Sequence, residues 1–289
     1  MQNQVIFSIL MCNYNNANYI SQAIDSVLKQ SFENWELSIV DDCSTDNSME
    51  IIKEYESIDS RIKVFLNSEN SGYGKSLAKN IELATGKYGA ILDPDDALTP
   101  QALQLMHDVF KKDNELVGAY SQMYYCDKDL KIEKIFEFTK KVPSNSTYLE
   151  HGRMAMTHFF VFDREKFIMH GNIDTRYRNA LDQDWYYKIE EIGKVEFVNC
   201  PLYYYRVSPT GISQGIKKRY FTTKDHLEIA KNAINRRGIT GRKKIKIISK
   251  IKALLFYTKY RFEKSEKNPQ ALLSLYKSKY HQIISKIYD

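Results

Sequence analysis

The sequence predicts an α/β fold with a mostly parallel central sheet, flanked by helices and followed by a basic helical extension. Short apolar runs alternate along the chain with stretches whose apolar residues recur at helical spacing. Polar loops follow the apolar runs, and Lys and Arg gather in residues 215–289. Strands that alternate with helices form largely parallel sheets, whose ligands bind beyond the carboxyl ends of the strands. We therefore expect the first four polar loops to meet at one edge of the sheet.

The first strand is predicted over residues 5–12, an apolar run interrupted only by Ser8. It ends in the polar loop 13–16, whose side chains suit hydrogen bonding. A helix with one apolar face follows, marked by the spacing of Ile20, Ala23, Ile24, Val27 and Leu28. Strand, loop and helix together form the first half of a βαβ unit.

Three more strands are predicted by the apolar runs at residues 35–40, 62–66 and 88–92. The helix after the first of these should begin near Asn47 and run through Ile58, because Glu50 three residues after Asn47 completes a capping signature. The helix before the last strand carries Leu77, Ile81 and Ala84 at helical spacing.

A loop rich in glycine and serine, residues 71–76, precedes the helix that carries Leu77. A phosphate-binding P-loop requires Gly where this chain has Glu69, and a dinucleotide-binding fingerprint requires Gly in place of Leu77. We therefore interpret this glycine loop as a flexible turn before a helix.

Three carboxylates lie within four residues at Asp93-Pro94-Asp95-Asp96, directly after the strand at 88–92. Thr99-Pro100 then predicts the start of a helix, so this acidic loop lies at the end of a strand. Adjacent like charges raise one another's pKa unless a cation neutralises them. Two carboxylates on a short loop suit Mg²⁺ or Mn²⁺, which fill their remaining positions with water and substrate phosphates. The alternative is a solvated acidic turn in which Asp96 or Thr99 caps the next helix.

The second half of the chain is predicted to add further strands and a second carboxylate pair. A helix at 100–112 is followed by a strand at 116–125, a hairpin partner at 131–139, a short apolar run at 159–162 and closing strands at 195–198 and 202–207. His158, at the head of the short apolar run, is interpreted as structural. Asp182 and Asp184 precede a predicted helix at 185–193. They either cap that helix or supply a general base opposite the acidic loop.

Charge is distributed unevenly along the chain. Residues 215–289 hold 20 Lys and Arg against 5 Asp and Glu, whereas residues 1–214 hold 22 against 31. In the basic region, Ile and Leu between residues 245 and 255 interleave with lysines in an amphipathic pattern: Lys243, Lys244, Lys246, Lys250 and Lys252. This pattern predicts either a surface for an anionic partner such as a membrane, or a helical face packed on the main domain by its apolar stripe.

The composition is that of a globular protein, with 43% hydrophobic and 27% charged residues. The four cysteines are far apart in the sequence, at Cys12, Cys43, Cys126 and Cys200, and no signal peptide is recognised at the start. We therefore expect a reduced, cytoplasmic protein. No apolar run approaches the roughly 20 residues that a membrane-spanning helix needs.

In their order and spacing, the motifs resemble those of family 2 glycosyltransferases, which have the Rossmann-like GT-A fold. The resemblance covers most of residues 5–213 and runs through 8–15, 24–30, 40–46, 78–80, 86–88, 92–96, 171–174, 183–185 and 204–206. It implies a catalytic domain at 1–214, with a nucleotide-sugar half at 1–98 and an acceptor half at 99–214. The basic helical region at 215–289 would follow it.

The resemblance implies transfer of a sugar from a nucleotide donor, commonly UDP-linked, to an acceptor hydroxyl with inversion at the anomeric carbon. Asn13 and Tyr14 would line the nucleoside pocket, and Asp42 would bind the base. Lys79 would make a point-charge contact to phosphate where relatives often carry Arg. In the acidic loop, the residues implied for the donor are Asp93, near the ribose, and Asp95, and those implied for Mn²⁺ or Mg²⁺ are Asp95 and Asp96.

The resemblance also implies a catalytic base. Asp184 matches that base, and it would take the proton of the acceptor hydroxyl. Many relatives have an acidic residue where this chain has Gln183, which makes Asp182 a candidate substitute. Relatives often carry His where Ser208 stands, so a third metal ligand stays open.

We therefore expect a metal-dependent glycosyltransferase that is cytoplasmic and peripheral on the inner face of the plasma membrane. Its acceptor would be a glycan or a lipid-linked molecule in cell-surface polysaccharide or lipopolysaccharide-type synthesis, and its basic region would bind an anionic membrane surface.

Three alternatives stay open. A metal-dependent nucleotidyltransferase would ordinarily have a Gly-rich, basic loop after the first strand, and a phosphatase would have its Asp-x-Asp motif there. A non-enzymatic anionic-surface-binding protein would need only the basic region. Nucleic acid is not an expected partner, because no reader motif is present and the acidic body would repel phosphates.

Overall fold

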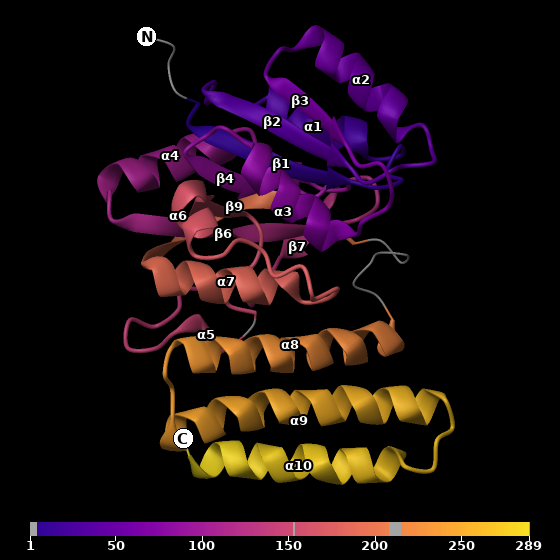
Figure 1. The fold of residues 1–289 in the computed structure, drawn as a ribbon, viewed down its shortest axis with the longest axis vertical. Helices are drawn as coiled ribbons and strands as arrows, with labels where there is room; N and C mark the ends of the chain where they lie inside the picture. The colour runs from indigo at the N-terminus through magenta and orange to yellow at the C-terminus, as the bar shows by residue number, and fades with distance from the viewer. Residues whose placement is uncertain (1–4, 153, 208–214, 289) are drawn as a thin grey trace. The chain divides into compact units, whose positions relative to one another are not determined.

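The computed structural model describes residues 5–152, 154–207 and 215–288 (Figure 1). The chain forms two compact units, one spanning residues 1–175 and 188–208 and the other residues 176–187 and 209–289. The first contains the sheet, and the second contains the long C-terminal helices. The predicted domain boundary at residue 214 lies outside the described residues and stays a prediction.

In the described part of the chain, nine strands form one sheet in the order β3-β2-β1-β4-β8-β6-β9-β5, with β7 paired to β6. Parallel pairing joins the four strands β1 (Phe7–Asn13), β2 (Trp35–Asp41), β3 (Ile62–Leu66) and β4 (Tyr88–Ile91). The others are β5 (Ala97–Leu98), β6 (Leu116–Cys126), β7 (Ile132–Ile135), β8 (Phe160–Asp163) and β9 (Lys194–Arg206). β8 lies antiparallel between β4 and β6, and β9 is parallel to β6. The predicted α/β fold with a mostly parallel sheet is confirmed.

The helices of the first unit are α1 (Ile20–Leu28), α2 (Ser48–Ile58), α3 (Tyr73–Leu83), α4 (Ala102–Lys112), α5 (Tyr148–His151) and α6 (Arg164–Met169). The division between the two units falls within α7 (Leu181–Ile192). The second unit continues with α8 (Ile216–Arg236), α9 (Gly241–Ser265) and α10 (Ala271–Ile287). The predicted basic helical extension is confirmed by these three helices.

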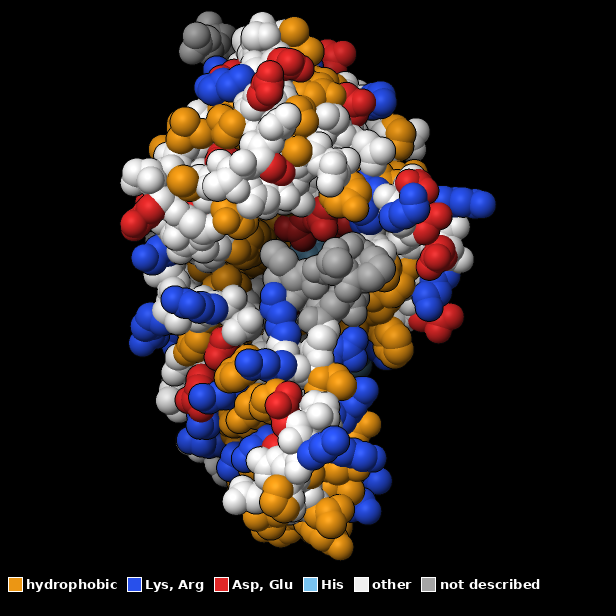
Figure 2. All heavy atoms as spheres, turned by 90° about the vertical axis from the view of Figure 1, so that its right-hand side faces the viewer, with side chains coloured by type: hydrophobic (Ala, Val, Ile, Leu, Met, Phe, Trp, Pro, Cys, Tyr) orange, Lys and Arg blue, Asp and Glu red, His pale blue; other side chains and the backbone are white. Residues whose placement is uncertain are grey.

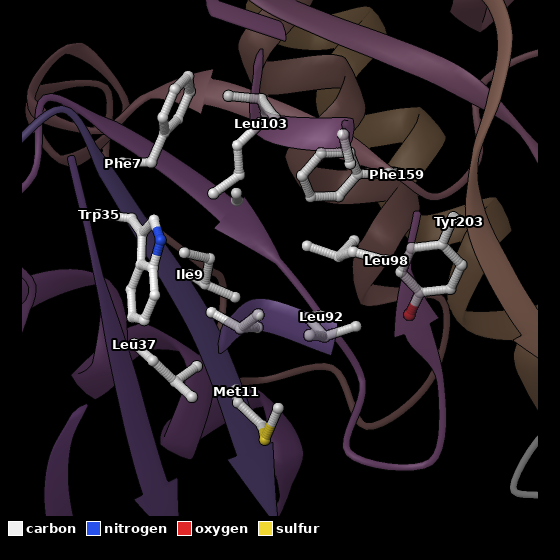
Figure 3. Close-up of a cluster of buried hydrophobic side chains, with 14 of the residues drawn as sticks. Phe7, Ile9, Met11, Trp35, Leu37, Leu92, Leu98, Leu103, Phe159 and Tyr203 are labelled. Atoms are coloured by element: carbon white, nitrogen blue, oxygen red, sulfur yellow. The ribbon is translucent and has the colours of Figure 1, made fainter. Parts of the chain in front are cut away.

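The main hydrophobic core lies between the sheet and helices α1 and α4. Successive side chains of a strand point to opposite faces, so every second residue of β1 enters this core. Phe7, Ile9 and Met11 lie there with Trp35 and Leu37 of β2 (Figure 3). All seven residues of β2 are buried, as expected for a parallel strand covered on both faces.

The two closing strands predicted at 195–198 and 202–207 are a single strand, β9, so that prediction is wrong. Val198 pairs with Ser121 of β6, but the next residue of β6, Gln122, pairs with Pro201. β9 therefore carries extra residues at this point, where the register shifts. Proline has no amide hydrogen to donate and is tolerated at such an irregularity. The break in the apolar pattern marks this shift rather than a loop.

Two helix starts and one predicted cap differ from the structure. α7 begins at Leu181, four residues earlier than predicted, so Asp182 and Asp184 both lie in its first turn. The residue before α2 is Asn47, as predicted, but its side chain makes no capping hydrogen bond. α4 begins at Ala102 and is preceded by Gln101, also without a side-chain cap. Neither Asp96 nor Thr99 therefore caps this helix.

In the second unit, α8, α9 and α10 lie side by side (Figure 1). α8 ends where Gly238 adopts a φ of 59° and the Ile239 amide donates to the carbonyl oxygen of Ile234, a helix stop that suits glycine. Ile247 and Ile251 of α9 are buried. Ile245 of the same stripe is 41% exposed, so the stripe is packed only in part, and both of its interpretations stay predictions. None of the described helices combines the length and hydropathy that spanning a membrane requires.

Candidate active site

The carboxyl ends of β1 and β2 are tied together by hydrogen bonds between the loops that follow them. The Asp42 amide donates to the carbonyl oxygen of Asn13 (2.8 Å), and Asn13 Nδ2 donates to Asp41 Oδ1 (2.7 Å). The loop of β1 also receives a contact from that of β2, since the Thr45 amide donates to Asn15 Oδ1 (2.7 Å). Asn13 is 1% exposed, whereas the Tyr14 ring is 45% exposed. Of the two residues predicted to line a nucleoside pocket, one is therefore buried and the other presents its ring to solvent.

Asp42 fastens the glycine loop to the end of β2. Its carboxylate accepts hydrogen bonds from Asn67 Nδ2 (2.8 Å), the Ser71 amide (2.8 Å) and the Gly72 amide (2.7 Å). Burial raises the pKa of this carboxyl, but these hydrogen bonds and one to Ser76 outweigh that effect and hold the pKa below its ordinary value. The glycine loop is therefore attached to an ionised Asp42, in contrast to the flexible turn that the sequence predicted.

Lys79 reaches the same cluster from α3. Its Nζ donates to the carbonyl oxygen of Leu66 (3.0 Å) and to Asn67 Oδ1 (2.8 Å). Asn67 thus links the Lys79 ammonium to the Asp42 carboxylate. The structure brings these two predicted donor-binding residues together at the carboxyl ends of β2 and β3.

The acidic loop, residues 93–96, lies at the end of β4, which is the parallel neighbour of β1. Cys12 in β1 lies within the electrostatic influence of both Asp93 and Asp42, and their negative charges help burial to raise the pKa of its thiol. The acidic loop and the β2 loop are therefore at the same edge of the sheet. This is the arrangement that the sequence predicted.

The end of β9 holds the acidic loop in place. The Arg206 amide donates to Asp96 Oδ1 (2.7 Å), and Arg206 Nε donates to the carbonyl oxygen of Asp95 (2.5 Å). The other guanidinium nitrogens donate to Gln22 Oε1 (2.6 Å) and to the carbonyl oxygen of Lys128. The Arg206 side chain thus ties the acidic loop to α1 and to the turn after β6.

The carboxylates of the acidic loop have different surroundings. Asp96 is 2% exposed, and burial, followed by repulsion from Asp95 and Asp93, raises its pKa well above the ordinary value. Burial and repulsion from Asp93 raise the pKa of Asp95 to about 6, although Arg206 and His158 oppose the shift. Asp93 and Asp95 are partly exposed. The loop therefore concentrates negative charge that its protein neighbours do not fully offset.

Two residues beside the acidic loop were not assigned to it from the sequence. The Tyr203 hydroxyl accepts a hydrogen bond from the Asp93 amide (3.1 Å). The His158 Nε2 lies 3.8 Å from Asp93 Oδ2, and its ring stacks on that of Tyr203 with a centroid distance of 5.3 Å. His158 is packed, as a structural residue would be, but it also adjoins the carboxylates. The sequence gives no local signal for these contacts, because the residues are far apart along the chain.

Asp182 and Asp184 belong to the second unit. Asp184 is buried, and its Oδ1 lies 3.9 Å from a guanidinium nitrogen of Arg236 in α8. Asp182 Oδ2 accepts a hydrogen bond from the side chain of Gln183 (2.8 Å). The C-terminal helices therefore supply a cation beside the predicted base. That Asp184 faces the acidic loop stays a prediction, and Ser208 lies outside the described residues.

Within the part of the chain that the structure describes, no group of three or more His, Cys, Asp and Glu side chains is arranged to hold a metal ion. The carboxylates that the sequence singled out for metal binding share the acidic loop. Carboxylate oxygens are the donors that Mg²⁺ and Mn²⁺ prefer, and a divalent cation there would offset the charge that raises the pKa of Asp95. The donor set thus fits a cation whose remaining ligands come from water or substrate.

Comparison with known proteins relates the chain to a family. The model of a family described as glycosyl transferase family 2 matches residues 8–171. A chondroitin synthase of Escherichia coli is 30% identical over 261 residues, which are 90% of this chain and 37% of that protein. The chain spans between 24% and 37% of the length of the first curated relatives it matches.

Two solved structures show the fold. One is S. aureus TarS in complex with UDP-GlcNAc, with a TM-score of 0.63 and 15% identity, covering 98% of this chain and 91% of that one. The other is GalNAc-T7 with UDP, GalNAc and Mn²⁺, with a TM-score of 0.62 and 16% identity, covering 80% of this chain and 48% of that one. The α/β architecture described above is thus similar to theirs.

Proposed function

Because the chain belongs to glycosyl transferase family 2 and has a GT-A-like fold, we propose that it transfers a sugar from a UDP-linked donor to a hydroxyl group, with inversion. One observation carries the proposal. The acidic loop, with the pKa of Asp95 raised to about 6, lies at the same sheet edge as the loops that carry Asn13 and Asp42. A concentration of negative charge at a ligand-binding edge suits a cation that bridges to a diphosphate.

Asp95 is the metal ligand that the geometry favours. It is partly exposed, whereas Asp96 is buried and already accepts a hydrogen bond from the Arg206 amide. Asp93 shares the exposed side of the loop and stays a candidate for ribose or metal contact. When bound, Mn²⁺ or Mg²⁺ would stabilise the negative charge that develops on the diphosphate leaving group. The Mn²⁺ in the GalNAc-T7 structure supports the choice of cation.

The donor's nucleoside would occupy the loops after β1 and β2. The exposed Tyr14 ring is available to stack on the base of the nucleotide. The Asp42 carboxylate would accept a hydrogen bond from the same base. The side chains of Asp42 and Lys79 are both hydrogen-bonded to Asn67 in the structure. Binding of the donor would therefore either replace these hydrogen bonds or form beside them. The UDP-GlcNAc bound to TarS supports a UDP-linked donor.

The acceptor hydroxyl would lose its proton to Asp184. An alcohol is a weak nucleophile until a positioned base removes its proton, and a carboxylate can perform that role. Arg236, 3.9 Å away, would orient the carboxylate. The Asp182 carboxylate accepts a hydrogen bond from the Gln183 side chain, and Asp182 remains the second candidate for the base.

The acceptor we propose is a growing glycan or a lipid-linked molecule in cell-surface polysaccharide synthesis. The similarity to a chondroitin synthase supports a polysaccharide product. The +15 balance of residues 215–289 supports binding at an anionic membrane surface, on the cytoplasmic side where we expect the protein.

A panel of nucleotide sugars tests this function. In the presence of Mn²⁺, we expect one UDP-sugar to raise the melting temperature and to be hydrolysed slowly with release of UDP. Asp95→Asn should remove both effects, and Asp108→Asn, a partly exposed carboxylate on α4, is the matched control. Release of pyrophosphate from a nucleoside triphosphate, without UDP release, would instead indicate a nucleotidyltransferase. Absence of both activities, with anionic surfaces still bound, would indicate a non-enzymatic binding protein.

A further inference from the structure

Helix α10 packs against α9 with small side chains and exposes its large apolar ones. The buried residues of α10 are Ala271, Ser274, Ser278 and Ser285. Ser278 Oγ donates to the carbonyl oxygen of Ala253 (2.8 Å), and Ser274 Oγ donates to Glu263 Oε2 (2.6 Å). The exposed apolar residues are each 54% to 68% exposed and are Leu272, Leu273, Tyr276, Tyr280, Ile283 and Ile287. The packed face of α10 is therefore made of small side chains, and its large apolar side chains lie on the exposed face.

The six exposed residues form one stripe, which we call the α10 stripe. At 3.6 residues per turn they fall within an arc of about 100°, and the four small buried residues are centred about 180° away. Figure 2 shows hydrophobic side chains gathered at the lower end of the molecule, with Lys and Arg side chains beside them. Ile58 and Met169, at helix ends, are exposed apolar side chains that are isolated along the sequence. A continuous apolar stripe on a protein surface marks an interaction site.

The charges around the α10 stripe identify the kind of partner. Lys279 and Lys286 lie within about 40° of one edge of the stripe, and Lys277 lies within about 40° of the other. All three are exposed. An apolar stripe flanked on both sides by lysines matches an anionic lipid surface, where the apolar residues enter the acyl boundary and the ammonium groups meet phosphates. Tyr276 and Tyr280 have the ring and hydroxyl that suit the headgroup level.

We propose that the α10 stripe is a membrane-binding surface, which lies in the plane of an anionic bilayer and inserts its Leu, Ile and Tyr side chains below the headgroups. The proposal rests on the proposed function only in placing the protein at an anionic membrane. It assigns membrane contact to α10 instead of the lysine-rich segment of α9, whose Ile247 and Ile251 are buried. The chemistry required of the partner is a fluid apolar layer beneath a negatively charged surface.

Vesicle sedimentation with the full chain tests the proposal. Vesicles of equimolar phosphatidylglycerol and phosphatidylcholine are compared with vesicles of phosphatidylcholine alone. We expect the double variant Ile283→Ser, Ile287→Ser to lower the partition coefficient for anionic vesicles at least about tenfold. The matched control is Ile58→Ser, Met169→Ser, which removes side chains of equal or greater exposure and should bind as the wild type does. Circular dichroism and melting curves establish that each variant is folded.

A second variant separates charge from insertion. Replacing Lys277, Lys279 and Lys286 by Gln should reduce binding to anionic vesicles and weaken its dependence on salt, because three charges near the surface are removed. If the Ile283, Ile287 variant binds vesicles as strongly as the wild type, the assignment to α10 is overturned. The protein would then bind membranes through another surface. Failure of the wild type to sediment would overturn membrane binding itself.

A second copy of the chain could also cover the stripe. Sedimentation equilibrium without lipid would then show a dimer of the wild type and a monomer of the Ile283, Ile287 variant. If that variant also binds vesicles as the wild type does, the proposal is overturned. UDP release, measured separately without vesicles, reports on glycosyl transfer, so failure of one proposal is distinguishable from failure of the other.

Discussion

Replacement of Arg206 by Met should both destabilise the first unit and weaken donor binding. Arg206 is buried, and its guanidinium donates to the carbonyl oxygen of Asp95, to Gln22 Oε1 and to the carbonyl oxygen of Lys128. It also lies 4.5 Å from the centre of the Tyr19 ring. Methionine would retain part of the packing and the backbone amide bond to Asp96, but none of the hydrogen bonds of the guanidinium.

The size of the effect follows from these contacts. Hydrogen bonds that involve a charged group contribute about 1.5–3 kcal/mol each, and a buried acceptor that is left unpaired costs about 1–3 kcal/mol. Because three acceptors lose the guanidinium, we expect the free energy of unfolding to fall by about 3–5 kcal/mol. Since the acidic loop loses the side-chain bond to Asp95 and keeps only the bond from the residue 206 amide to Asp96, the affinity for UDP with Mn²⁺ should fall as well.

Arg164→Met is the matched control. Arg164 is also buried, and it also donates to backbone carbonyl oxygens, those of Gly86 (2.8 Å) and Ile81 (3.2 Å). Because Gly86 precedes β4, these contacts lie at the opposite end of that strand from the acidic loop. Urea unfolding should show a loss of stability for both variants, whereas calorimetry with UDP and Mn²⁺ should show weaker binding only for the Arg206 variant.

Two results would refute this reasoning. An Arg206→Met protein that unfolds within about 1 kcal/mol of the wild type would mean that the guanidinium contacts contribute little. Equal loss of UDP affinity in the Arg164 and Arg206 variants would mean that general destabilisation, rather than the acidic loop, controls donor binding.

Three further predictions concern the base, the metal and the sheet. Asp184→Asn should retain UDP binding by calorimetry and lower sugar transfer by about 10²–10⁴-fold; full turnover would exclude Asp184 as the base. Because the pKa of Asp95 is raised to about 6, protons should compete with Mn²⁺ for this carboxylate below pH 6. The Mn²⁺-dependent affinity for UDP should therefore fall as the pH is lowered through about 6. The Asp95→Asn variant should not show this pH dependence. Gly86→Ala should destabilise by about 3 kcal/mol or more, since its Cβ would lie 2.7 Å from the Ser8 amide nitrogen. Gly89→Ala, which meets movable side-chain ends, should cost less by thermal melting.

The parallel strands were among the elements that the sequence predicted best. β3 (Ile62–Leu66) matches its predicted range although it is an edge strand and only partly buried, and β2, which is buried on both faces, differs by one residue. β9 was predicted as two strands, one on each side of residues 199–201, whereas the structure has one strand whose register shifts at this point. Local patterns therefore locate strands but do not show which strands the sheet joins.

The candidate site shows the same limit. Parallel topology was enough to predict that the loops with Asn13, Asp42 and Asp95 share one edge. It was not enough to show that the Ser71 and Gly72 amides bind Asp42, or that Arg206 holds the acidic loop. Such partners are chosen by packing between distant segments, for which a single sequence contains no periodic signal.

The C-terminal helices illustrate a different difficulty. Residues 215–289 were recognised as basic and amphipathic, but the lysine-rich segment of α9 was the stretch singled out for surface contact. In α10, serine hydroxyls bond to α9 and allow small residues to form the packed face. Hydropathy assigns serine to the surface, so the orientation of this helix required the structure.

The hydrogen bonds between the end of β9 and the acidic loop also affect the order in which parts of the chain fold during synthesis. Arg206 lies 110 and 111 residues after its two partners in the loop, Asp96 and Asp95. A ribosome releases the first four strands, which pair with one another, long before it has made β9. Closing such a long segment is entropically costly and slow compared with local pairing. We therefore expect a nascent chain to have a formed parallel sheet and an unsupported acidic loop, and to acquire its metal affinity only when the end of β9 docks.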